Sequence, residues 1–205
     1  LSGCAPTTPS TGWPLAKANT AGIDWMRICH AISRFSSILT LTSDTAHSVL
    51  LMAFSMLGER WLHCLTYRSL KYAVPGAVGA AVALPNAEIV AFVGDGGFQM
   101  TGQELMTAVA HRLPIKVVVA DNQAWGSILV SQERRYGDEG IYGTRLAAPD
   151  FAALARAYGR PAWTVEATAE FGPAFGEALA HDGPALIHLK LDERDISPFA
   201  AEQAV

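Results

Sequence analysis

The sequence is poor in charge, in cysteine and in long apolar runs. Only 17% of the 205 residues are charged and the formal net charge is −4, which gives no reason to expect nucleic acid or an anionic membrane as a partner. The three cysteines are far apart and form no C-x-x-C pair, so we expect a reduced, cytoplasmic protein without a disulfide or zinc site. The longest apolar run, residues 49–57, is too short to cross a bilayer.

Metal-ligand spacing is also missing from the six histidines. His111 closes a predicted helix, where a cation interacts favourably with the helix dipole, and His188 falls inside a predicted strand. We therefore expect structural roles for the histidines.

The apolar half of the sequence suits one well-buried globular domain. Residues 1–20 are rich in Pro, Thr, Ser and Gly and are predicted to be a linker or an irregular lead-in. Residues 21–198 are predicted to form the domain, and residues 199–205 a tail. The sequence begins with leucine, so we expect either a piece of a longer chain or a separate subunit.

Predicted strands and helices alternate along the domain. Strongly apolar runs, typical of strands covered on both faces, lie at 88–93, 115–120 and 185–190. Further strands are expected at 37–42 and 162–165, and helices at 23–32, 49–57, 101–111, 150–158 and 167–180. This alternation predicts an α/β fold with a doubly wound, mostly parallel sheet and helices on both faces. In such sheets ligands bind beyond the carboxyl ends of the strands.

A glycine-rich turn follows the strand predicted at residues 88–93. It reads Gly94, Asp95, Gly96 and Gly97, and its glycines would allow positive φ angles and a close approach of main-chain N–H groups to a ligand. Taken alone, such a tripeptide is ordinary turn chemistry.

A helix is predicted to begin directly after this turn. Thr101-Gly-Gln-Glu104 fits a capping box, in which Thr101 and Glu104 satisfy each other's main-chain N–H groups. The positive end of that helix would then lie near the glycine turn, which is a favourable place for phosphate.

A carboxamide follows the next predicted strand. Asn122 stands 27 residues after Asp95, with one helix and one strand between them, so two neighbouring strand ends would bring the two side chains together. Mg²⁺ prefers a few protein oxygens and completes its octahedron with phosphate oxygens and water. One Asp, one Asn and a main-chain carbonyl would fit that preference.

This pattern resembles the thiamine diphosphate-dependent enzymes, whose signature is a G-D-G turn followed some two dozen residues later by Asn. The resemblance implies thiamine diphosphate and Mg²⁺ as cofactors, with the metal bound by the side chains of Asp95 and Asn122 and by the carbonyl of Ala124. It also implies that the glycine turn and the segment Ala124, Trp125 and Gly126 hold the diphosphate through main-chain N–H groups. Asp121 stands where many members have a first Asn.

Further segments resemble the acetolactate synthase-like branch of this family. The small-residue helix expected at 72–80 looks like the one that precedes the G-D-G strand there. Just before it, the resemblance places Leu70 as the apolar wedge beneath the cofactor, although Arg68 and Lys71 replace two glycines of that turn. Asp44 matches an Asp-x-Gly segment in which the glycine is replaced here.

One catalytic residue of the family has no counterpart in this sequence. The family's glutamate, which hydrogen-bonds the aminopyrimidine ring, lies on an N-terminal domain that the partner subunit usually contributes, and no second domain of suitable length is present. The resemblance therefore implies a pyrimidine-binding domain on the same or a partner chain, and a homodimer or homotetramer. Alone, the chain is expected to be an incomplete enzyme.

The expected substrate is a 2-oxo acid. Ile128 stands in the substrate pocket where pyruvate decarboxylases commonly have an acidic residue, which favours carboligation. Ser131 replaces a tryptophan of true acetolactate synthases, so a relative of those enzymes is expected. A simple 2-oxo acid decarboxylase, or a non-catalytic domain that retains the fold, remains an alternative, whereas a nucleotide-binding oxidoreductase would want a third glycine in the turn.

Overall fold

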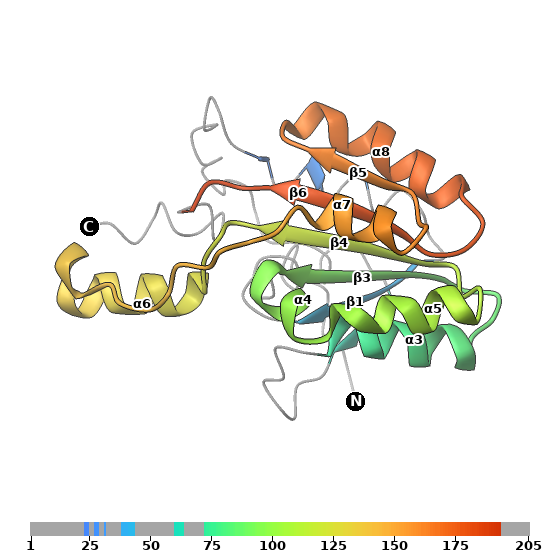
Figure 1. The fold of residues 1–205 in the computed structure, drawn as a ribbon, viewed down its shortest axis with the longest axis horizontal. Helices are drawn as coiled ribbons and strands as arrows, with labels where there is room; N and C mark the ends of the chain where they lie inside the picture. The colour runs from blue at the N-terminus through green and yellow to red at the C-terminus, as the bar shows by residue number, and fades with distance from the viewer. Residues whose placement is uncertain are drawn as a thin grey trace, which may run out of the picture.

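The computed structural model describes residues 23–24, 27–28, 31, 38–43, 60–63 and 72–193, with the backbone alone at 38–43 and 60–63. Its centre is a six-stranded sheet in the order β2-β1-β3-β4-β6-β5, and every pairing is parallel (Figure 1). The strands are β1 (Ile38–Ser43), β2 (Arg60–His63), β3 (Glu88–Gly94), β4 (Ile115–Asp121), β5 (Ala162–Val165) and β6 (Ala185–Lys190). The predicted α/β fold with a parallel sheet is confirmed.

Helices cover both faces of the sheet, as predicted. They are α3 (Ala73–Ala83), α4 (Asp95–Thr101), α5 (Leu105–Ala110), α6 (Gly126–Tyr136), α7 (Phe151–Ala157) and α8 (Thr168–Ala180), with short 3₁₀ turns at Gly102–Glu104 and Asp138–Gly140. One core cluster joins α3, α4, α5 and α7 to one face, and a second joins α8 and residues near Ile23 and Ile28 to the other.

The alternation of side chains along β3 explains how one strand serves two cores. Val90 and Phe92 belong to the α8 cluster, while Ile89, Ala91 and Val93 belong to the α3–α7 cluster, because successive side chains of a strand point to opposite faces. All five side chains are buried. The apolar run seen in the sequence therefore reflects burial on both faces.

The capping box predicted at Thr101 is wrong. The helical segment begins six residues earlier, at Asp95 with Gly94 as N-cap, and Thr101 makes no capping hydrogen bond. The Glu104 carboxylate instead accepts a hydrogen bond from the Thr107 hydroxyl at 2.9 Å. Burial of Phe98 between α4 and the sheet explains the earlier start, since a helical turn from Asp95 carries this ring into the core.

The positive φ angles expected of the glycine turn are also absent. Gly94 has a φ of −72°, and the described glycines with positive φ all lie elsewhere, at positions 137, 143, 159 and 183. The turn needs glycine for space instead, because a Cβ on Gly96 would lie 2.5 Å from the indole ring of Trp125.

Several sequence-based expectations fall outside the described residues. These are Leu70 with Arg68 and Lys71, Asp44, the helix at 49–57, the lead-in at 1–20 and the tail at 199–205. Within the part of the chain that the structure describes, no helix is long and apolar enough to span a membrane.

Candidate functional site

Two loops meet at the carboxyl edge of the sheet. Gly94 at the end of β3 pairs with Ala120 of β4. The next residue on each segment, Asp95 and Asp121 respectively, therefore lies at the same edge of the sheet. The Trp125 indole lies directly against Gly96, where a Cβ would collide with three ring atoms. The structure thus brings the glycine turn and the segment after β4 into contact, as the sequence predicts.

Asp95 is a buried carboxylate with one unused oxygen. Its Oδ1 accepts a hydrogen bond from the Gly96 N–H at 2.7 Å, while its Oδ2 has no partner among the described residues. Burial, and then the neighbouring Asp121 carboxylate, raise the pKa of Asp95 to about 7 against the lowering effect of main-chain N–H groups. An unpartnered buried oxygen is costly, and a bound cation would remove that cost.

Any such cation would need a mixed ligand set. The described residues contain no group of three His, Cys, Asp or Glu side chains able to hold a metal ion. Amide and main-chain oxygens must therefore supply the remaining protein ligands, which is the chemistry that Mg²⁺ accepts and that soft metals do not favour.

Asn122 is oriented by the chain that follows β6. Its Nδ2 donates a hydrogen bond to the Glu193 carbonyl at 3.2 Å. Because a carboxamide has one donor end and one acceptor end, this bond leaves the Oδ1 oxygen to act as an acceptor or a ligand. Asn122 is largely buried, with 9% of its surface exposed.

Ala124 presents its main chain in a defined direction. It forms an isolated antiparallel bridge with Arg145, in which the Trp125 N–H donates to the Thr144 carbonyl and the Leu146 N–H to the Gln123 carbonyl. In this type of bridge the facing pair itself exchanges no hydrogen bond. The Ala124 carbonyl therefore points away from Arg145.

A second buried carboxylate, Asp121, is fully engaged. Its Oδ2 accepts hydrogen bonds from His188 Nε2 at 2.7 Å and from Lys190 Nζ at 2.8 Å, and its Oδ1 accepts one from the Gln123 N–H at 3.2 Å. Burial by itself would raise the pKa of Asp121, but the hydrogen bonds from His188 and Lys190 and their charges lower it to about 2. Two adjacent carboxylates are thus held in very different environments.

The segment after Ala124 leads into α6. Trp125 precedes this helix, and its carbonyl accepts the N–H groups of Ile128 and Leu129. Ile128 lies on the first turn of α6 with 47% of its surface exposed, while Leu129 packs on Ala124. In Figure 1, α6 extends beyond the carboxyl edge of the sheet, away from the other helices.

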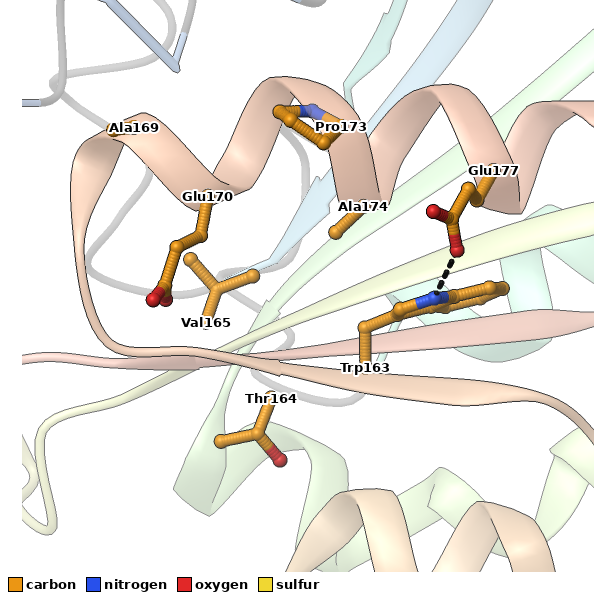
Figure 2. Close-up of a pocket in the computed structure, with 8 residues that line it drawn as sticks. All are labelled: Trp163, Thr164, Val165, Ala169, Glu170, Pro173, Ala174 and Glu177. Atoms are coloured by element: carbon orange, nitrogen blue, oxygen red, sulfur yellow. Dashed lines mark hydrogen bonds between the residues drawn. The ribbon is translucent and has the colours of Figure 1, made fainter.

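A groove lies elsewhere, between β5 and α8 (Figure 2). It is lined by Trp163, Thr164, Val165, Ala169, Glu170, Pro173, Ala174 and Glu177, and the Trp163 indole N–H donates to the Glu177 carboxylate at 2.8 Å. The groove shares no lining residue with the loops around Asp95 and Asn122.

The structure brings together most of the residues that the sequence singled out. Gly94 to Gly97 and Asn122 to Gly126 follow neighbouring strands and meet where Gly96 lies against Trp125, whereas the place of Leu70 is not described. Sequence reasoning missed the hydrogen bonds of Asp121 to His188 and Lys190. The available signal was the presence of two polar residues at the carboxyl end of the otherwise apolar strand β6.

Comparison with known proteins gives a consistent result. Residues 45–189 match the sequence model of a family described as "Thiamine pyrophosphate enzyme, C-terminal TPP binding domain". The chain is 32% identical over 139 residues to the acetolactate synthase large subunit of Pyropia yezoensis, covering 67% of this chain and 24% of that protein.

Two other relatives show the same relationship. Identity is 36% over 125 residues to the acetolactate synthase isozyme 2 large subunit of Escherichia coli K12, covering 61% of this chain and 23% of that protein. It is 27% over 179 residues to the probable acetolactate synthase large subunit of Methanocaldococcus jannaschii, covering 86% and 30%. The chain spans between a fifth and a third of the length of these curated relatives.

Proposed function

Because the chain belongs to the thiamine pyrophosphate enzymes, and matches their C-terminal cofactor-binding domain, we propose that it binds the diphosphate end of thiamine diphosphate through Mg²⁺. The observation that carries the proposal is the buried, unpartnered Oδ2 of Asp95. It lies where β3 and β4 end side by side, and Asn122 and Ala124 follow directly after β4.

The residues present fit the metal. Asp95 supplies a carboxylate oxygen, Asn122 its Oδ1 and Ala124 its carbonyl, and each is oriented by hydrogen bonds made through other atoms. Three protein oxygens leave the other positions of an octahedron to phosphate oxygens and water, which is the usual arrangement for Mg²⁺. A net charge of −4 on the sequence offers an anionic cofactor no general positive field, so local donors or a cation would have to supply the attraction.

The main chain around the metal ligands would hold the diphosphate. The glycine turn at Gly96 and Gly97 begins α4, and the segment Ala124 to Gly126 leads into the N-terminus of the eleven-residue helix α6. Helix N-termini favour anions, because unpaired N–H groups and the helix dipole point at the ligand.

For the whole protein, we propose an acetolactate synthase-like activity on a 2-oxo acid, with decarboxylation followed by carboligation. When bound, the cofactor supplies the nucleophilic carbon and the electron sink for this chemistry. The relatives are acetolactate synthase large subunits, which supports the assignment. The proposal includes a pyrimidine-binding domain that contributes the catalytic glutamate, a homodimer or homotetramer, and a cytoplasmic location.

The exposed apolar side chain of Ile128 supports carboligation over simple decarboxylation. It lies on the first turn of α6, two residues beyond Gly126, and offers no group to protonate a carbon. A decarboxylase would release an aldehyde from the 2-oxo acid, whereas a carboligase would release a 2-hydroxy-2-methyl or comparable condensed acid. Product identification by mass spectrometry distinguishes the two.

Cofactor binding can be tested by calorimetric titration of the native, full-length protein. We expect thiamine diphosphate to bind in the presence of Mg²⁺, and to bind far more weakly with chelator present. Asp95→Ala and Asn122→Ala are expected to abolish binding, while Asn86→Ala, an exposed asparagine in the turn before β3, serves as the matched control. Metal-independent binding, or undiminished binding by the Asp95 and Asn122 variants, would refute the proposal.

A further inference from the structure

Asp121, His188 and Lys190 form a buried cluster that the proposed cofactor chemistry does not use. The side chains come from neighbouring parallel strands, β4 and β6, which lie side by side in Figure 1. The strand register pairs Asp121 with Lys190, and Val119 with His188. Both donors therefore stand on the same face of the sheet as the Asp121 carboxylate, within hydrogen-bond distance of it.

Asp121 has little capacity left for a metal. Three donors occupy its two oxygens, whereas Asp95 Oδ2 has no partner among the described residues. The structure therefore separates two neighbouring carboxylates by role. Asp95 has an oxygen left for a ligand, whereas both oxygens of Asp121 accept hydrogen bonds from the protein.

Asp121 holds the backbone on which the proposed metal ligands stand. We call residues 121–126 the ligand loop. Within it, Gln123 has a φ of +56°, a left-handed conformation that non-glycine residues seldom adopt. The Asp121 Oδ1 accepts the Gln123 N–H, and the Leu191 N–H donates to the Asp121 carbonyl at 2.8 Å. These bonds fix the turn that separates Asn122 from Ala124.

His188 is held by ring packing, while its buried Nδ1 has no hydrogen-bond partner among the described residues. Its ring meets the edge of the Phe151 ring at a centroid distance of 5.1 Å, and Phe151 in turn packs on Phe98 of α4 at 5.3 Å. Its Nδ1 lies 3.5 Å from Asp150 Oδ1, at the start of α7. The cluster thus connects the ligand loop to α4, the helix that begins with Asp95.

We propose that Asp121 is a positioning residue for the metal, and that His188 and Lys190 act through it by anchoring its carboxylate. The proposal rests on the function proposed above, since it concerns the same metal. The charge of Asp121 is matched to Lys190: an asparagine at position 121 would present an N–H donor toward the lysine ammonium, which is a donor only. Outer groups that orient metal ligands typically change metal affinity by about 10- to 100-fold when removed.

The test measures the dissociation constant of Mn²⁺ in the presence of thiamine diphosphate, by electron paramagnetic resonance on the native, full-length protein. We expect Asp121→Asn to weaken Mn²⁺ binding at least about tenfold. Lys190→Met should weaken it by about threefold, because His188 still holds Asp121. The double variant Asp121→Asn/Lys190→Met should return to within about threefold of wild type, because the donor clash is removed and the new carboxamide can still accept the Gln123 N–H.

A matched control separates positioning from general stability. Lys116→Met removes the buried lysine of β4, at the end of that strand opposite Asp121, and should lower the melting temperature while leaving Mn²⁺ affinity within about twofold of wild type. Lys190 is about one-third exposed, so its variant is expected to fold even where Asp121→Asn does not.

The outcomes separate this proposal from the one on which it rests. Wild-type protein that binds no Mn²⁺ with thiamine diphosphate would refute the proposed function. Wild-type binding that is lost in Asp95→Ala but unchanged in folded Lys190→Met and Asp121→Asn would refute the positioning role alone. A double variant as weak as Asp121→Asn would refute the pairing of Asp121 with Lys190.

Discussion

Two buried charged side chains near opposite ends of strand β4, Lys116 on the strand and Asp95 beside its carboxyl end, differ in how their hydrogen bonds are satisfied. At the amino end, Lys116 donates hydrogen bonds to the His181 and Gly183 carbonyls, both at 2.7 Å. At the carboxyl end, the neighbouring Asp95 keeps Oδ2 without a partner among the described residues. Hydrogen bonds offset part of the cost of burying a charge, whereas a buried carboxylate oxygen without a partner costs stability unless a ligand binds it. The comparison therefore supports the proposal that the cofactor binds at the carboxyl end.

The largest expected effect is at the carboxyl end, where replacement of Asp95 should weaken cofactor binding without lowering stability. Asp95→Asn should weaken Mg²⁺-dependent thiamine diphosphate binding by more than about 100-fold, because a metal ligand loses its charge. The same change should leave the free energy of unfolding of the cofactor-free protein unchanged or raise it by about 1 kcal/mol, because an unsatisfied buried carboxylate becomes a neutral amide. Calorimetry and urea unfolding measure the two effects. Loss of stability together with binding would contradict the comparison.

At the amino end of β4, removal of the buried Lys116 charge should lower the stability of the protein. Lys116→Met leaves two buried carbonyls without their donor and should lower the free energy of unfolding by about 1–3 kcal/mol at pH 7. Urea unfolding measures it, with cofactor affinity as the second readout. An unchanged or increased stability would show that this lysine is not a structural anchor.

The difference in stability between wild type and Lys116→Met should also depend on pH. Burial, and then the nearby Arg160 charge, lower the pKa of Lys116 from 10.5 to about 8. Between these values the unfolded chain binds the proton and the folded protein does not, so stability rises with pH across this window. The stability of wild type relative to Lys116→Met should therefore increase by about 2 kcal/mol from pH 8 to pH 10. A constant difference would mean that the pKa is not lowered.

Two glycine substitutions should change the free energy of unfolding by smaller amounts and in opposite directions. Gly96→Ala places a methyl group 2.5 Å from the Trp125 ring and should lower the free energy of unfolding by about 1–2 kcal/mol. Gly79→Ala, in α3 with nothing within 4 Å of the added Cβ, should raise it by about 0.5–1 kcal/mol. Thermal unfolding of the pair measures both. Equal effects would show that the contact between the glycine turn and Trp125 is loose.

Sequence alone predicted the parts of the molecule that depend on local pattern. The bounds of β5 and β6 agree residue for residue with the expected strands, and β3 and β4 each extend one residue further. Strands buried on both faces give continuous apolar runs, and these are readable without tertiary information. The expectation that Asp95 and Asn122 lie near one another came from the same strands, because parallel strands end at one edge of the sheet.

What the sequence did not reveal depends on contacts between distant residues. The start of α4 at Asp95 is decided by burial of Phe98 and by the space that Gly96 leaves for Trp125, whereas the local signal at Thr101 favoured a later start. The hydrogen bond of Asp121 to His188 joins residues 67 positions apart. It depends on the register of β4 with β6, and a one-residue shift would point the donors to the other face.

The most direct test of the account is a crystal structure of the native, full-length protein with thiamine diphosphate and Mg²⁺. We predict the metal within about 2.1 Å of Asp95 Oδ2, Asn122 Oδ1 and the Ala124 carbonyl oxygen, with the Asp121 carboxylate still hydrogen-bonded to His188 and Lys190. A metal bound by Asp121, or a cofactor bound away from the carboxyl ends of β3 and β4, would contradict it.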